Sequence, residues 1–302
     1  MQNAKLFYLL LSSVIGTLIL FSSYTQAEKE GVEISVEHTL PQIIKSISLD
    51  KTFHFSGEVL PKTADARERL DRELSVNAYW HSSTLMNLKL AGKYFPTIER
   101  ILAEEGVPDD FKYLAVAESG LRNVVSSASA KGFWQFMKPS AKEFNLEVND
   151  EVDERYHLEK STRAAAKYIK QLKKRFGTWT DAAASYNIGP TSYSRIQRQQ
   201  NETNYYNLNL TSETSRYVFR LFAIKEIMTN PDIYGFYIEH GDKYEQLPEY
   251  YEVMVDKSID DWGGFAHKHG LSYRELKIHN PWLIDNKLTV KVNTYYIKIP
   301  RS

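Results

Sequence analysis

Between about residues 63 and 235, apolar side chains recur at the three- and four-residue spacing of one helix face, and glycine or proline closes most of the runs. The clearest run is Ser161 to Phe176, whose apolar stripe ends at Gly177. Another run begins at Ser212, a residue type that caps helix N-termini, and stops at Asn230. Such faces are buried by packing helix on helix, so we predict a mainly α-helical domain over residues 63–235.

Two prolines mark predicted helix starts within this domain. Pro96 precedes a short apolar pattern that Gly106 closes, which predicts a short helix opening at Pro96. Pro108 is followed by Asp109 and Asp110, and acidic residues stabilise the positive end of a helix dipole. We therefore predict a further helix that begins at Pro108.

The pattern changes after about residue 236. Tyr250 to Val255 and Tyr295 to Ile299 have the composition of strands, whereas Ile259 to His269 and Tyr273 to His279 have helical patterns. Together they predict a small α+β domain over residues 236–302, with the element order strand, helix, helix, strand.

The N-terminal segment has the pattern of an export signal. Lys5 precedes an apolar run from Leu6 to Phe21, and a cleavage site can follow Ala27. We predict a signal peptide over residues 1–27, and the alternative is an uncleaved N-terminal membrane anchor. Either way the remaining chain is exported, to the periplasm or cell envelope. Residues 28–62 are weakly periodic and are predicted to be a linker or an N-terminal arm.

Composition excludes several classes of function. The 302 residues contain 38 Lys and Arg against 38 Asp and Glu, so zero net charge gives no reason to expect nucleic acid as a partner. The chain has no cysteine, which excludes disulfides, thiolate metal sites and a cysteine nucleophile. No His, Asp and Glu cluster has metal-ligand spacing, so neither metal nor organic cofactor is expected. We expect a monomer.

Glu118 is a carboxylate on an apolar helix face. Phe111, Leu114 and Ala115 lie seven, four and three residues before it and therefore share its side of a helix. Gly120 follows closely, which places the carboxylate at the negative end of the helix dipole. Burial and this dipole both raise a carboxyl pKa, as a general acid near neutral pH requires. The alternative is a glutamate at the edge of the face that reaches water.

Two polar and aromatic clusters follow Glu118. The stretch Gly132 to Met137 combines a glycine, bulky aromatics and Gln135, which suit stacking on sugar rings and hydrogen bonding to hydroxyl or N-acetyl groups. The alternative is a buried amphipathic turn. The stretch Ser185 to Asn187 ends an alanine-rich helix, where asparagine is also common as a cap.

Together these segments resemble the catalytic domain of the lytic murein transglycosylases, most of all the membrane-bound type D group of the lysozyme-like superfamily. Glu118-Ser119 is similar to the family's glutamate–serine signature, and Gly132 to Met137 to its glycine–aromatic–glutamine motif. Tyr186-Asn187 is similar to its alanine–tyrosine–asparagine motif, with Ser185 replacing alanine. A helical fourth motif has its counterpart in Glu213-Thr214 and Tyr217-Val218. The four stand in the family's order over roughly residues 80 to 230.

The C-terminal domain resembles a degenerate LysM module, which binds N-acetylated glycans. Tyr251 to Val253, Asn280-Pro281 and Tyr296 to Pro300 are among the matching residues, whereas Asp256-Lys257 replaces the usual glycine–aspartate turn. The resemblance implies glycan binding, and the alternative is a packing domain that only steadies the catalytic one.

The resemblance implies a lysozyme-like helical fold and a reaction with peptidoglycan glycan strands. Glu118 would be the sole catalytic acid/base. It would protonate the bond between N-acetylmuramic acid and N-acetylglucosamine, then take the proton of the 6-hydroxyl so that a 1,6-anhydro end forms. The implied substrate-binding residues are Ser119, Ser126, Phe133, Trp134, Gln135, Met137, Tyr186, Asn187, Glu213 and Tyr217. Ser127 is an alternative to Ser126 as the serine facing the substrate.

Two other functions remain open from the sequence. A lysozyme-like muramidase would hydrolyse the same bond and would need a second carboxylate, for which Asp153, Asp181 and Glu213 are candidates. A non-catalytic peptidoglycan-binding protein would hold glycan without turnover. Reducing ends identify hydrolysis, anhydro ends identify transglycosylation, and binding without products identifies the third function.

Overall fold

A computed structural model of the protein describes residues 45–301. Residues from Ile47 onward form one compact unit. The predicted signal peptide, residues 1–27, lies outside the described residues, as does the predicted arm as far as residue 44. Among residues 45–301, no helix is long and apolar enough to cross a membrane.

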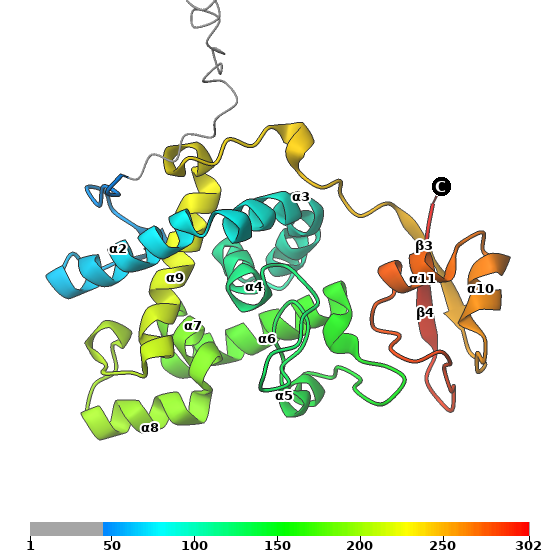
Figure 1. Ribbon diagram of the computed structural model, residues 1–302. Helices are drawn as coiled ribbons and strands as arrows, with labels where there is room; N and C mark the ends of the chain where they lie inside the picture. The colour runs from blue at the N-terminus through cyan, green and yellow to red at the C-terminus, as the bar shows by residue number, and fades with distance from the viewer. Residues whose placement is uncertain (1–44, 302) are drawn as a thin grey trace, which may run out of the picture. The chain divides into compact units, whose positions relative to one another are not determined.

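The first and larger part of this unit is helical, as the apolar periodicity predicts (Figure 1). Its helices are α2 (Ala64–Tyr79), α3 (His81–Glu104), α4 (Lys112–Ser119), α5 (Lys138–Glu143), α6 (Leu158–Phe176), α7 (Trp179–Ile188), α8 (Pro190–Gln200) and α9 (Ser212–Thr229). Short 3-10 turns lie between these helices at Asp109–Phe111, Glu154–Tyr156 and Tyr205–Asn207, and after α9 at Pro231–Tyr234 and His240–Asp242.

Helix α9 is the centre of the helical core. It packs against α2, α4 and α7, while α6 packs against α3 and α7. Tyr217, Phe219 and Leu221 on α9 are each at most 1% exposed. Three successive alanines of α7, residues 182–184, are fully buried, and their small side chains allow neighbouring helices to approach closely. This packing brings α4 and its Glu118 beside α9.

Residues just before α2 join the same core. Strands β1 (His54–Phe55) and β2 (Glu58–Val59) form an antiparallel hairpin. The Phe55 ring is fully buried, with ring centroids 5.3 Å from Phe111 and 5.8 Å from Phe222. The last part of the predicted linker or arm thus packs as an arm on the helices.

Helix boundaries depart from the sequence predictions in several places. The helix predicted to begin at Pro108 starts as a 3-10 turn over Asp109–Phe111, and the α-helix α4 begins only at Lys112. The helix predicted to open at Pro96 is wrong, because Pro96 lies inside α3, which already begins at His81. The missing N–H costs one backbone hydrogen bond, but buried Leu88 and Leu102 on either side hold both halves in one core. The cap of α9 is Thr211 rather than Ser212, and its hydroxyl accepts from the Thr214 N–H.

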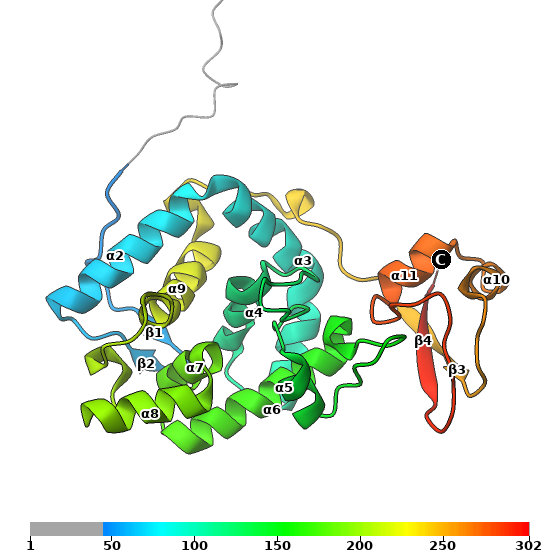
Figure 2. The same cartoon turned by 60° about the horizontal axis from the view of Figure 1, so that its bottom comes forward.

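The four last elements form a small α+β module, which we call the C-terminal module (Figures 1 and 2). They are β3 (Tyr250–Val255), α10 (Trp262–Lys268), α11 (Tyr273–His279) and β4 (Tyr295–Pro300). Strands β3 and β4 pair antiparallel over their whole length. The module has its own apolar core, which contains Trp262, Leu276 and Ile297. The predicted order of strand, helix, helix and strand is confirmed.

Candidate active site

Glu118 lies in the last turn of α4. Phe111, Leu114 and Ala115 are fully buried, and Glu118 on the same side of the helix is partly buried. Gly120 ends the helix in the left-handed conformation, with φ of 59°, and its N–H donates to the Val116 carbonyl. The local sequence thus places a carboxyl group where an apolar helix face meets the edge of the core.

Tyr217 of α9 meets this carboxyl group. Its phenolic oxygen donates a hydrogen bond of 2.5 Å to Oε1 of Glu118, across 99 residues of sequence. Burial raises the pKa of Glu118 to about 7, although the Tyr217 hydrogen bond and the charge of Arg220 oppose this shift. A carboxyl group with this pKa can hold and release a proton near neutral pH, as a general acid/base must.

Arg220 belongs to a charge network on α9. Its guanidinium pairs with Glu213 at 3.0 Å and with the buried Glu73 of α2 at 3.6 Å. Arg216 also pairs with Glu73, at 2.6 Å. Glu213, Tyr217 and Arg220 are spaced four and three residues apart and so lie on one side of the helix. The sequence reasoning missed Arg220 and Glu73. The two residues lie on helices α9 and α2, far apart in the sequence, and no local pattern indicates that they form an ion pair.

Ser119 connects α4 to the loop of residues 126–137, called the 126–137 loop below. Its buried hydroxyl lies 3.0 Å from the carbonyl oxygens of both Ala115 and Phe133, and its single proton is shared between them. It also accepts from the Arg122 N–H at 3.3 Å. The structure therefore places Ser119 between protein groups, where it fixes the distance between Glu118 and the loop.

Gln135 is strained inside the 126–137 loop. Its φ is 48°, a left-handed conformation that costs a non-glycine residue roughly 1–3 kcal/mol. Its Nε2 atom offsets this cost by donating to the carbonyls of Gly132 at 2.8 Å and Val124 at 3.1 Å. Ser126 is partly buried and accepts from the Ala130 N–H at 3.0 Å, whereas Ser127 is exposed. The amide of Gln135 is thus fixed in orientation by the backbone of its own loop and of Val124, just before the loop.

Phe133 and Trp134 lie in the core, against the expectation that both contact substrate. Phe133 is 3% exposed and packs edge-on against Tyr94. Trp134 is fully buried, and its indole N–H donates to Thr162 at 2.9 Å. Neither ring offers an open face on which a sugar could stack. Both rings therefore fit the alternative interpretation, a buried amphipathic turn. Met137, at the end of the loop, is 43% exposed.

The tyrosine and asparagine at the end of α7 meet different neighbours. The Tyr186 hydroxyl donates to the Trp134 carbonyl at 2.7 Å. Burial and then the nearby Glu118 charge raise the Tyr186 pKa well above its usual value, so this group stays protonated. Oδ1 of Asn187 accepts from the Thr214 hydroxyl at 2.9 Å. The structure therefore brings Glu118, Tyr186 and Tyr217 together, while Asn187 joins α7 to α9.

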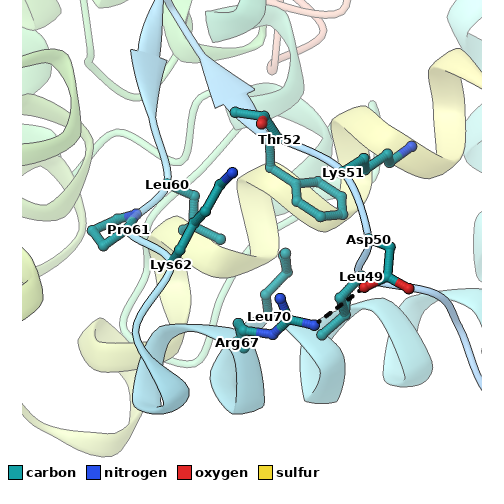
Figure 3. A pocket seen from close by; sticks show the side chains of 10 residues that line it. Leu49, Asp50, Lys51, Thr52, Leu60, Pro61, Lys62, Arg67 and Leu70 are labelled. Atoms are coloured by element: carbon teal, nitrogen blue, oxygen red, sulfur yellow. Dashed lines mark ion pairs between the residues drawn. The ribbon is translucent and has the colours of Figure 1, made fainter.

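A hollow of about 330 Å³ lies elsewhere, between the β1–β2 hairpin and α2 (Figure 3). Arg67 and Asp50 form an ion pair of 3.6 Å across its rim, and Lys51 pairs with Glu226. The carboxyl group in its lining, Asp50, is exposed to solvent, whereas that of Glu118 is partly buried beside a tyrosine hydroxyl. Within residues 45–301 there is no group of three His, Asp and Glu side chains that could hold a metal ion.

Comparison with known families identifies both parts of the chain. Residues 96–209 match the transglycosylase SLT domain, and residues 251–302 match the C-terminal LysM-like domain of soluble lytic transglycosylases. The chain therefore carries an SLT domain that contains Glu118, the 126–137 loop and Tyr186, followed by a LysM-like domain that coincides with the C-terminal module.

Two curated proteins are similar to parts of this chain. The membrane-bound lytic murein transglycosylase D of Escherichia coli (strain K12) is 25% identical over 249 residues, which cover 80% of this chain and 53% of the relative. A putative tributyltin chloride resistance protein of Alteromonas sp. (strain M-1) is 30% identical over 113 residues, 37% of this chain and 55% of the relative. The chain thus spans about half the length of these curated relatives.

Among solved structures, the 70 kDa soluble lytic transglycosylase of Escherichia coli aligns with 59% of this chain and 33% of its own, at 15% identity and a TM-score of 0.39. The lytic transglycosylase Slt of Pseudomonas aeruginosa aligns with 50% of this chain and 26% of its own, at 17% identity and a TM-score of 0.36.

Proposed function

We propose that this protein is a peptidoglycan lytic transglycosylase with Glu118 as its sole general acid/base. The observation that carries the proposal is a partly buried carboxyl group with a pKa of about 7, hydrogen-bonded by Tyr217, inside an SLT domain. The SLT domain and the murein transglycosylase relative support the class of reaction. Export to the periplasm or cell envelope, predicted from residues 1–27, belongs to the same proposal.

In the proposed reaction, Glu118 gives up one proton and later takes a different one, so it ends in its starting form. Protonated Glu118 gives its proton to the glycosidic oxygen between N-acetylmuramic acid and N-acetylglucosamine, and the carbon–oxygen bond breaks. The acetamido oxygen of the muramic acid stabilises the positive charge at the anomeric carbon. Ionised Glu118 then takes the proton of the 6-hydroxyl, whose oxygen closes on that carbon. The product has a 1,6-anhydro end, and no water is consumed.

Roles for the neighbouring residues follow from their positions. Tyr217 stabilises the ionised form of Glu118 through its hydrogen bond. Ser126, Gln135, Met137 and Glu213 are partly or fully exposed, so we propose them for contacts with sugar hydroxyl, N-acetyl or peptide groups.

The muramidase alternative requires a second carboxylate. Two of its three candidates are occupied within the protein. Asp153 is buried and paired with Arg155 at 2.7 Å, and Asp181 is buried and accepts from Tyr193 at 2.5 Å. Glu213 alone is exposed, and it pairs with Arg220. These pairings favour a reaction with one carboxyl group.

The test is a digest of purified peptidoglycan, with products read by mass spectrometry and Glu118→Gln as the control. Anhydro-muropeptides from the wild type alone would support the proposal. Reducing-end products would favour the muramidase, and retention on sacculi without any product would favour a binding protein.

A further inference from the structure

The C-terminal module is joined to the helical domain by more than the chain that connects them. A segment of the helical domain, residues 147–159, supplies part of the module's core. Val152 is 1% exposed in that core and forms an antiparallel bridge with Leu283. The next residue, Asp153, donates its N–H to the Trp282 carbonyl at 2.9 Å.

We call this contact between residues 147–159 and the C-terminal module the seam. Side chains extend the seam on both sides. The Glu151 carboxylate accepts from the N–H of Thr289 at 2.6 Å and from its hydroxyl at 2.9 Å. The Ile284 N–H donates to the Glu151 carbonyl at 3.0 Å. On the other flank, Lys298 of β4 forms an ion pair with Glu159 of α6. The seam therefore joins the helical domain to the C-terminal module by backbone hydrogen bonds, a buried apolar side chain and ion pairs.

The same segment also holds the 126–137 loop. The buried carboxylate of Asp153 accepts from Nε and Nη2 of Arg155 at 2.8 and 2.7 Å, and pairs with Lys131 at 3.3 Å. Arg155 then donates from Nη1 to the carbonyls of Ser129 at 3.3 Å and Phe136 at 3.2 Å. Asp153 therefore contacts the module through its backbone and the loop through its side chain.

The loop in turn is fixed to the helix that carries Glu118. Gly132 packs so tightly on Arg155 that a Cβ atom there would lie 1.9 Å from the Arg155 carbonyl oxygen. One residue further, the Phe133 carbonyl accepts from Ser119, the residue after Glu118. A continuous chain of contacts thus runs from the module to the carboxyl group.

We propose that the C-terminal module braces the 126–137 loop through Asp153 and Arg155, and so supports turnover at Glu118 without touching the substrate. Glu151, Asp153 and Arg155 are then positioning residues. The role in turnover rests on the proposed function, whereas the bracing itself does not. If the module only held glycan, damage to the seam would weaken binding to long strands and leave the loop unchanged.

Two variants and one control test the brace in the full chain. Glu151→Ala removes the carboxylate contacts with Thr289 and leaves the 126–137 loop's own contacts intact. Asp153→Asn weakens the pairing with Arg155 and Lys131 directly. Asp150→Ala is the matched control, because Asp150 is the neighbouring exposed carboxylate of the same segment. Thermal unfolding confirms that each variant is folded.

The first measurement is hydrogen exchange of the Ser126, Lys131 and Phe136 amides, which bond within the loop. Both variants should raise their exchange rates about tenfold, and the control should not. The second is kcat and KM on sacculi and on a soluble fragment of two disaccharide units. We expect kcat to fall about tenfold on both substrates with KM little changed, since misplacement acts on the reacting geometry.

Unchanged hydrogen exchange of the loop amides in folded Glu151→Ala would overturn the proposed brace. A fall in kcat on sacculi but not on the soluble fragment would also overturn it. A loss for Asp153→Asn alone would make Asp153 a local loop residue and would also overturn the module's part. If the wild type releases no product from either substrate, the proposed function fails, while the exchange experiment still decides the brace.

Discussion

The phenolic hydroxyl of Tyr217 donates to Oε1 of Glu118 at 2.5 Å, so a residue of the central helix α9 controls the carboxyl group at the end of α4. The bond favours the ionised carboxylate, whereas burial favours the protonated one. The balance, a pKa of about 7, leaves both forms populated near neutral pH. An acid that must later act as a base needs both forms.

Tyr217→Phe should disturb this balance. A hydrogen bond to a charged group is worth about 1.5–3 kcal/mol, so its loss raises the pKa of Glu118 and weakens the ionised form. We expect kcat to fall by roughly tenfold or more. The alkaline limb of the pH profile of kcat/KM, which lies near the pKa of about 7 in the wild type, should move to higher pH. An unmoved limb would show that Tyr217 does not set the acidity of Glu118.

Glu118→Gln should stabilise the fold at alkaline pH while abolishing turnover. The folded-state pKa of about 7 lies above the usual 4.5. The stability contributed by the protonated carboxyl is therefore fully present below pH 4.5 and is lost as the pH rises through about 7. Glutamine does not ionise, so above pH 7 the variant should be more stable by up to about 3 kcal/mol.

Urea unfolding of Glu118→Gln and wild type at pH 4 and pH 8 measures this difference. Equal stability at pH 4 and a more stable variant at pH 8 is the expected pair of results. If the variant were less stable than the wild type at both pH values, burial would not be destabilising the ionised form of Glu118.

The sequence predicts the position of Glu118 better than its partners. The spacing of Phe111, Leu114 and Ala115 suffices to place Glu118 on a buried face, because helix geometry is local. Tyr217 was recognised from a motif, but its bond to Glu118 depends on how α4 and α9 pack. Local periodicity does not specify which helices meet, so this contact is available only from the fold.

The aromatic residues of the 126–137 loop illustrate a second limit. Composition alone cannot distinguish a buried Trp134 from a sugar-stacking one, because both need a large apolar ring. What decides is the Thr162 hydroxyl of α6, which accepts the indole N–H inside the core. The pairing of Arg220 with Glu73 was missed for a similar reason, since Glu73 reaches Arg220 from α2, far away in the sequence.

Charges on α9 should shift the acidity of Glu118 in opposite directions. The positive charge of Arg220 lowers its pKa, and the negative charge of Glu213 raises it. Arg220→Met should therefore move the alkaline limb of kcat/KM to higher pH, and Glu213→Gln should move it to lower pH. The Glu213 effect should shrink at high salt, because this side chain is 58% exposed and is screened. Shifts in the same direction for both variants would contradict the network.

Gly132→Ala should destabilise the protein more than other glycine substitutions. Gly132 has φ of +81°, and a Cβ atom would lie 1.9 Å from the Arg155 carbonyl oxygen, a backbone atom that cannot move aside cheaply. The left-handed conformation and the clash together should cost about 3 kcal/mol or more.

Gly241→Ala is the matched control, since its Cβ would meet nothing within 4 Å and should change stability by less than about 0.5 kcal/mol. Urea midpoints of the two variants compare these costs. A Gly132→Ala protein as stable as the control would mean that the segment around Arg155 yields, and such a segment could not hold the 126–137 loop against Glu118.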